Sequence, residues 1–275
     1  MIFDAHMHVG TFPLFNVSLD RDGLRDTMAE HGITGGVVFH PDNDYVREVV
    51  ESLEGVHGLV WANPRLPGYL EEAKRFLDHP RFLGMKLHPL LDGYHPNDPA
   101  VHPLVELLVE RDLPVLVHCG HPIFTLPWSI EELIVGFPEA KVILGHMGHG
   151  NVVYINASID VAERNPNVYL ETSGMPMHTK IREAVERVGP DRVLYGSDVP
   201  FHHPSVEIQK VRVSGLEAEL VGRVLGANAR ALFLGDRMGD DRAVLTGEEV
   251  SRGGLDRSTT AGNRPEPLRG KERIQ

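Results

Sequence analysis

The sequence predicts an α/β protein with the architecture of a (β/α)8 TIM barrel that carries one extra helix at its C-terminal end. Short runs rich in β-branched residues recur eight times before residue 236, and a segment with helical spacing or composition follows each of them. Strands that alternate with helices in this way form a parallel sheet through right-handed crossovers, and eight such units are enough to close a barrel. An open, doubly wound sheet is the alternative that this pattern alone leaves.

The individual elements can be placed in chain order. The predicted strands cover residues 2–8, 36–39, 58–62, 83–87, 115–119, 142–146, 168–171 and 193–196. The predicted helices between and after them cover residues 24–30, 45–53, 69–77, 101–110, 129–137, 152–163, 181–188 and 206–211. A closing helix is predicted for residues 214–233, where an apolar stripe at helical spacing is formed by Leu216, Leu220, Val221, Val224 and Leu225.

The last 40 residues differ in composition from the rest of the chain. Residues 236–275 contain no aromatic side chain and carry eight acidic and eight basic side chains. Such a segment buries too little apolar surface to offset the entropy lost on ordering. We therefore expect one barrel domain over residues 1–235 and a disordered tail over residues 236–275.

Composition limits the partners and the compartment. The 275 residues are 41% hydrophobic and 24% charged, as in a soluble enzyme-sized domain, and the net charge of −12 disfavours nucleic acid and anionic membranes as partners. No apolar run approaches the roughly 20 residues of a membrane-spanning helix, the first residues do not resemble a signal peptide, and Cys119 is the single cysteine. These features predict a cytoplasmic protein with a small-molecule substrate, and a homo-oligomer is admissible.

The chain contains 16 histidines, and two of them lie on the first predicted strand. Asp4, His6 and His8 alternate with apolar residues, so a regular strand directs all three to one face, which is the inside of a barrel. Two imidazoles separated by one residue suit a metal ion such as zinc. An ordinary pair of histidines without a ligand role is the alternative for this motif taken alone.

Polar side chains also end three later predicted strands. His118 ends strand five, His146 ends strand six, and Asp198 follows strand eight. Parallel strands present their carboxyl ends at one rim, where barrel enzymes build their active sites. A hydrogen-bonded core histidine explains any one of these residues, but not the repetition on four strands. Closing the barrel makes strands one and eight neighbours, so that His6, His8 and Asp198 can share an ion that His118 approaches.

The ordered set of motifs resembles the amidohydrolase superfamily, and within it the branch that includes aminocarboxymuconate-semialdehyde decarboxylase and other carboxy-lyases. The resemblance spans residues 1–234. Its motifs are Asp4-Ala5-His6-Met7-His8-Val9-Gly10, Gly84-Met85-Lys86-Leu87-His88-Pro89, Val117-His118-Cys119-Gly120, Gly145-His146-Met147-Gly148 and Tyr195-Gly196-Ser197-Asp198-Val199-Pro200-Phe201. Each motif is weak alone, whereas the set in this order is specific.

The resemblance implies one divalent metal held by His6, His8, His118 and Asp198, with His146 near a metal-bound water. Superfamily members with two metals carry a carboxylated lysine on a strand comparable to that of Lys86, but the sequence around Lys86 resembles the one-metal branch. We therefore expect a mononuclear site that holds zinc, with manganese and iron also admissible.

A bound ion of this kind lowers the pKa of water from about 15.7 to around 7. Asp198 and His146 are then the catalytic candidates, Asp198 as acceptor of the water proton and His146 as the group that holds water or protonates a leaving group. Lys86 is a candidate for an acidic substrate group or an oxyanion, and an internal salt bridge to Asp4 or Glu171 is its alternative. Arg65 is a second candidate for a substrate carboxylate, and a solvated loop arginine is the alternative there.

Three functions are compatible with these residues. The first is a metal-dependent hydrolase that uses an activated water on a small amide, ester or lactone. The alternative is a metal-dependent, non-oxidative decarboxylase of an unsaturated or aromatic carboxylic acid, whose substrate carries a carboxylate. A metal-binding protein without catalysis is the third. The residue pattern alone does not separate hydrolysis from decarboxylation.

Overall fold

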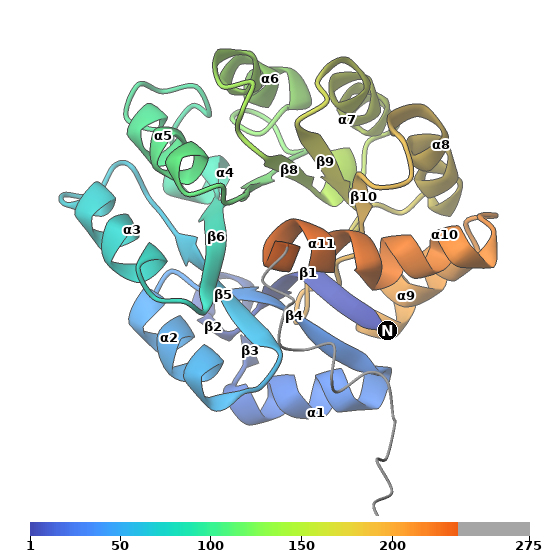
Figure 1. The fold of residues 1–275 in the computed structure, drawn as a ribbon, viewed down its shortest axis with the longest axis horizontal. Helices are drawn as coiled ribbons and strands as arrows, with labels where there is room; N and C mark the ends of the chain where they lie inside the picture. The colour runs from blue at the N-terminus through green and yellow to red at the C-terminus, as the bar shows by residue number, and fades with distance from the viewer. Residues whose placement is uncertain (236–275) are drawn as a thin grey trace, which may run out of the picture. The chain divides into compact units, whose positions relative to one another are not determined.

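The computed structural model describes residues 1–235, and the tail expected for residues 236–275 lies outside this part of the chain. Eight strands form one parallel sheet in chain order (Figure 1). Their bounds are β1 Ile2–His8, β4 Ile33–Phe39, β5 Val56–Trp61, β6 Phe82–Leu87, β7 Val115–His118, β8 Val142–Gly145, β9 Val168–Glu171 and β10 Val193–Leu194. All eight predicted strands are present, although β10 has only two residues.

The sheet closes between its first and last strands. The amide of Ala5 donates to the Tyr195 carbonyl at 3.0 Å, and the amide of His8 donates to the Val199 carbonyl at 2.8 Å. In the opposite direction, the amide of Asp198 donates to the carbonyl of His6 at 2.7 Å. The chain is therefore a TIM-barrel-like α/β fold, as predicted, and its closure brings the first and last strand ends together.

Helices surround the barrel. Their bounds are α1 Arg21–His31, α2 Asn43–Ser52, α3 Tyr69–Leu77, α4 Pro89–Asp92, α5 His102–Glu110, α6 Pro127–Gly136, α7 Val152–Arg164, α8 His178–Val188, α9 Pro204–Arg212, α10 Ala218–Gly222 and α11 Asn228–Leu234. A π-helical turn, Arg223–Ala227, joins α10 to α11 and makes the predicted closing helix nearly continuous. None of the helices within residues 1–235 is long and apolar enough to cross a membrane.

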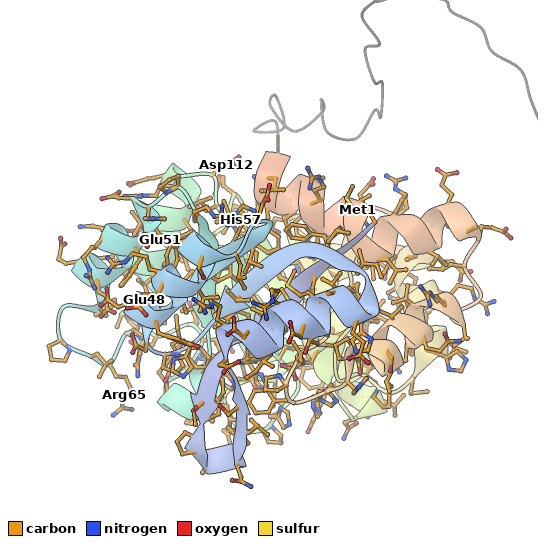
Figure 2. All side chains as sticks on the ribbon, turned by 90° about the horizontal axis from the view of Figure 1, so that it is seen from below. Met1, Glu48, Glu51, His57, Arg65 and Asp112 are labelled. Carbon is orange, nitrogen blue, oxygen red and sulfur yellow. The ribbon has the colours of Figure 1, made fainter. Side chains whose placement is uncertain are left out.

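Helix α11 covers one end of the barrel (Figure 1). Its Ala229 and Phe233 pack with the inward-facing residues of the strands, and the Phe233 ring stacks on Phe3 at 6.4 Å between centroids. Figure 2 shows Met1, where β1 begins, at this end of the molecule, and Arg65 near the opposite end. Since the strands run away from α11, their carboxyl ends and the residues that follow them form the open rim.

Strand β1 contains an irregularity that the sequence pattern did not predict. Asp4 pairs with Gly36 and Met7 pairs with Val38, so β1 has one residue more than β4 over this interval. Such a bulge interrupts the alternation of side chains. The expectation that Asp4, His6 and His8 share a face is wrong for Asp4, because Ala5 packs inside the barrel and the Asp4 side chain lies on the other side of β1.

The sequence pattern also did not predict a short hairpin. Strands β2 Gly10–Phe12 and β3 Val17–Leu19 pair antiparallel directly after β1, with a 3-10 turn, Pro13–Phe15, between them. Asn16 closes this turn in the left-handed conformation, with φ of 53°, which asparagine tolerates better than most residues. The hairpin places Phe12 and Phe15 beside the rim of the barrel.

Candidate metal centre and cavity

The loops that follow β8 and β10 bend sharply as they leave the barrel. His146 and Asp198 have φ values of 62° and 55°, in the left-handed region that costs a non-glycine residue about 1–2 kcal/mol. Residues held in such conformations cluster at functional sites, where the surrounding structure enforces them. Both residues are buried at the rim, and their catalytic roles stay predictions.

Three predicted ligands lie close together at the open rim of the barrel. Nε2 of His8 lies 3.0 Å from Oδ1 of Asp198, and Nε2 of His6 lies 3.3 Å from the same oxygen. All three side chains are buried, and their potential ligand atoms lie within 4.8 Å of one another. The structure therefore brings together residues from the two ends of the barrel chain.

This donor set fits a cation. Burial lowers the pKa of both His6 and His8 well below 6.5, so the rings are neutral at pH 7. Burial also raises the pKa of Asp198 to about 7, an effect that the Lys86 charge partly offsets. Two imidazole nitrogens and a carboxylate oxygen then face one point at short range, and a divalent ion is the group that stabilises such a set.

Glu171 is a site residue that the sequence analysis named only as a partner for Lys86. It lies at the end of β9, fully buried, and its Oε2 accepts a 2.7 Å hydrogen bond from Nδ1 of His6. The same carboxylate accepts bonds from the His146 amide and from the amide and hydroxyl of Ser173. A carboxylate on the far nitrogen of a histidine fixes its tautomer and directs Nε2 at the metal. The sequence signal was an apolar strand ending in an acid.

His118 lies in a row of rings rather than in the group of three. Its Nδ1 is 3.1 Å from Nε2 of His146, and its Nε2 is 2.9 Å from Nδ1 of His121. His88 stacks on His118 at 4.0 Å between centroids and on Trp61 at 5.4 Å. Both predicted residues, His118 and His146, therefore line the same rim, and neighbouring rings fix the plane of His118.

Lys86 is fully buried on β6 beside the centre. Its Nζ lies 3.4 Å from Nε2 of His6 and 4.7 Å from the centre of the Phe39 ring. Burial lowers the pKa of Lys86 to about 8, although the charges of Asp198 and Glu171 act against this. No described carboxylate comes within 4.0 Å of Nζ, so the salt bridge considered for it does not form within residues 1–235.

A cavity of about 210 Å³ opens above these residues. One part of its wall is apolar and aromatic: Phe12, Phe15, Trp61, Leu91 and Phe201. The rest of the wall combines histidines with the candidate ligands: His8, His88, His118, His121, His146, His149, Asp198 and His202. Sites for drug-sized ligands measure about 300–1,000 Å³, so this cavity suits a smaller molecule.

Arg65 stands apart from this wall. Its side chain is exposed, and its guanidinium donates a 2.6 Å hydrogen bond to the carbonyl of Gly93. Figure 2 shows it near the rim end of the molecule with its side chain directed outward. It is not among the residues that line the cavity. The arrangement is that of the loop arginine considered as the alternative in the sequence analysis.

Comparison with known proteins identifies the family of this barrel. A family model described as amidohydrolase matches residues 5–234. A gamma-resorcylate decarboxylase from Polaromonas sp. is 29% identical over 117 residues, which are 35% of this chain and 35% of that protein. The matched segment thus spans about a third of the length of this curated relative.

Solved structures share the fold at low sequence identity. A dihydroxybenzoic acid decarboxylase from Polaromonas sp., with bound manganese and the inhibitor 2-nitroresorcinol, aligns with a TM-score of 0.68 and 18% identity over 84% of this chain and 96% of that one. A candidate 2-pyrone-4,6-dicarboxylic acid hydrolase from Pseudomonas putida aligns with a TM-score of 0.66 and 18% identity over 84% and 97%.

Proposed function

The chain belongs to the amidohydrolase family, and on that premise we propose that it is a metal-dependent decarboxylase of a small aromatic carboxylic acid. The observation that carries the proposal is the group of His6, His8 and Asp198 at the foot of a cavity with an aromatic wall. A metal next to such a wall suits a substrate that has a carboxylate on a planar ring.

Decarboxylation replaces hydrolysis as the preferred reaction. The residue pattern is compatible with both reactions, with hydrolysis as the main expectation and decarboxylation as its alternative. The curated relatives are named for the decarboxylation of an aromatic acid, as is a similar structure that holds manganese. Manganese, which the residue pattern admits beside zinc, gains support from that similar structure, and both ions accept imidazole and carboxylate ligands.

The residues would divide the chemistry as follows. His6, His8 and Asp198 would hold the ion, with His118 as the fourth ligand that the family resemblance implies, and the ion would supply a Lewis acid for the substrate's oxygen atoms. Oδ1 of Asp198 faces His6 and His8, whereas Oδ2 lies 3.6 Å from Nε2 of the half-buried His202. Oδ2 is therefore the oxygen free to carry a proton.

Decarboxylation of an aromatic acid needs one proton on the ring carbon that bears the carboxylate. We assign this transfer to Asp198, because it lines the cavity and its Oδ2 does not face His6 and His8 but lies 3.6 Å from Nε2 of His202. The carbon–carbon bond then breaks, its electron pair returns to the ring, and carbon dioxide leaves. His202, nearer to solvent, would return a proton to Asp198.

His146 is better suited to accept a hydrogen bond than to donate a proton to the substrate. Its Nδ1 lies 3.2 Å from the carbonyl oxygen of Ser173, which fixes the proton on Nδ1. Burial lowers the pKa of His146 well below 6.5 and disfavours a second proton. Nε2 therefore presents a lone pair toward His118 and the cavity.

A product assay tests the reaction. Protein loaded with Mn²⁺ or Zn²⁺ is incubated with a panel of dihydroxybenzoates, lactones and amides in D₂O. We expect carbon dioxide together with an arene that carries deuterium at the carbon that lost its carboxylate. Hydrolysis of the lactones or amides without carbon dioxide release would favour the hydrolase instead. Absence of turnover across the panel by the fully metal-loaded protein would count against both.

Substitutions test the assigned roles. Asp198→Ala and His6→Ala should lower the metal content and abolish turnover, since each removes a proposed ligand. His118→Ala should lower the metal content if His118 is the fourth ligand. His146→Ala should lose turnover while it keeps most of the metal. Full activity in His6→Ala, Asp198→Ala and His146→Ala would place the active site elsewhere. Metal content is measured by elemental analysis beside the product assay.

A further inference from the structure

Asp4 contacts the two chain segments that carry His6 and Asp198. Its Oδ1 accepts a hydrogen bond from the His6 amide at 3.0 Å and another from the Ser197 amide at 3.0 Å. The first amide belongs to a proposed ligand, and the second directly precedes Asp198. A single buried oxygen thus joins β1 to the loop after β10, at the place where the barrel closes.

The bulge in β1 explains why a side chain takes this position. The extra residue between Asp4 and Met7 disrupts the ladder with β4, and a bulge of this kind leaves backbone groups in need of other partners. A buried amide without an acceptor destabilises the fold, because it loses its hydrogen bond to water without gaining another. The Asp4 carboxylate supplies an acceptor on the strand itself, so the bulge can persist within the barrel wall.

The surroundings of Gly36 show on which side of the strand Asp4 lies. A Cβ at residue 36 would approach the Asp4 carbonyl oxygen to 2.5 Å, the Met7 methyl carbon to 2.6 Å and the Asp4 Cβ to 3.1 Å. Met7 packs in the cluster between the barrel and its helices. Asp4 therefore points away from the group of His6, His8 and Asp198, and it does not contact the cavity.

The bulge changes the face of β1 on which the His6 side chain lies. Without an extra residue, strict alternation would direct Ala5 and His6 to opposite faces. With it, Ala5 packs in the inner cluster and His6 also reaches the inside, where its ring contacts Glu171 and Asp198. The direction of the His6 ring thus depends on the bulge in β1, which the Asp4 carboxylate stabilises.

We propose that Asp4 is a positioning residue for the metal centre: through the His6 and Ser197 amides it sets the relative placement of His6 and Asp198. This inference rests on the proposed metal site. Asp4 acts as a hydrogen-bond acceptor in this role, and neither its charge nor direct contact with the ion is required.

Three substitutions of Asp4 distinguish the effects of removing the hydrogen-bond acceptor, of moving it and of removing the negative charge. Asp4→Asn keeps an oxygen at the same distance from the backbone without the charge. Asp4→Glu keeps the charge but moves the oxygens by one methylene, and Asp4→Ala removes the acceptor. The matched control is Asn228→Ala. Asn228 is also buried, and its amide nitrogen holds the Pro190 and Val193 carbonyls at the other end of β10.

Metal affinity and metal geometry are the readouts. The affinity for Mn²⁺ or Zn²⁺ is measured by chelator competition, and the geometry by the visible absorption spectrum of the Co²⁺-loaded protein. We expect Asp4→Asn to stay within about threefold of the wild type, and Asp4→Ala and Asp4→Glu to lose about tenfold or more with an altered Co²⁺ spectrum. Asn228→Ala should unfold at a lower temperature but bind metal with unchanged affinity and spectrum.

The outcomes are distinguishable. Wild-type affinity and spectrum in folded Asp4→Ala would overturn the inference, and so would a tenfold loss in Asp4→Asn. If Asp4→Ala does not fold, the contrast between Asp4→Asn and Asp4→Glu decides, and equal affinity in these two overturns the inference. A wild-type protein that binds none of the three ions would overturn the proposed function together with this inference.

Discussion

Glu171 holds the proposed ligand His6 in place. Its substitution is therefore predicted to weaken metal binding, although its side chain does not reach the substrate. Its carboxylate holds Nδ1 of His6 and the His146 amide, so the neutral Glu171→Gln variant should weaken metal binding by about 10–100-fold. Chelator competition measures the loss. Glu207→Gln, which changes another buried glutamate paired with Lys210 on α9, is the matched control and should bind metal normally. Equal affinity in both variants would contradict this role.

Substitution of Lys86 distinguishes a role in substrate binding from a purely structural role. A buried ammonium 3.4 Å from Nε2 of His6 repels a cation at the centre, so Lys86→Met should bind the metal more tightly. If Lys86 also receives an acidic substrate group, the same variant should raise the KM by about tenfold, since a charge-assisted hydrogen bond is lost. Steady-state kinetics at saturating metal measure this. An unchanged KM would leave Lys86 without a role in substrate binding.

The hairpin of β2 and β3 contributes the outer part of the aromatic wall. The rings of Phe12 and Phe15 lie 5.3 Å and 5.2 Å from that of Phe201, so the hairpin and the loop after β10 make one surface. Phe15 is 46% exposed, and its removal should cost little stability. We expect Phe15→Ala to raise the KM for an aromatic acid several-fold at nearly unchanged thermal stability. Leu14→Ala is the control, because Leu14 is 80% exposed and does not line the cavity.

The strands show how far sequence patterns predict this fold. Continuous apolar runs such as residues 115–117 and Val142–Gly145 are buried on both faces, and that property of parallel strands is visible in the sequence. The orientation of Asp4 was not visible, because a bulge depends on pairing with β4 rather than on local composition. The site, too, could be predicted only in part from the sequence. Strand ends indicated His6, His8 and Asp198, whereas the role of Glu171 depends on three contacts that only the closed barrel creates.

The barrel as a whole concentrates uncharged histidines, and this determines how its stability varies with pH. Burial lowers the pKa of seven histidines below 6.5: His6, His8, His88, His118, His121, His146 and His149. The unfolded chain binds protons at these positions near pH 6.5 and the folded protein does not, so each contributes stability that is lost as the pH falls below about 6.5.

Four carboxyl groups act in the opposite direction. Burial raises the pKa of Asp4, Asp198 and Glu207 to about 7 and that of Asp92 to about 6, so their contribution is fully present below about pH 4 and is lost as the pH rises through 6 to 7. Between pH 7 and 5 the seven histidines therefore lose stability while the four acids gain it. Because the histidines outnumber the acids, we expect the loss to exceed the gain.

We therefore expect the metal-free protein to be acid-labile. An excess of only one proton taken up on unfolding would lower the free energy of unfolding by about 1.4 kcal/mol per pH unit, or the Tm by roughly 3–6 °C. Thermal unfolding in the presence of a chelator, measured from about pH 7 to about pH 5, tests this. Metal loading should raise the Tm at pH 7 and lose this effect toward pH 5, because Asp198, whose pKa burial raises to about 7 in the metal-free protein, must release its proton to bind. A metal-free Tm that stays level or rises on acidification would mean that the site's histidines are charged in the folded barrel, and the neutral donor set on which metal binding depends would then be wrong.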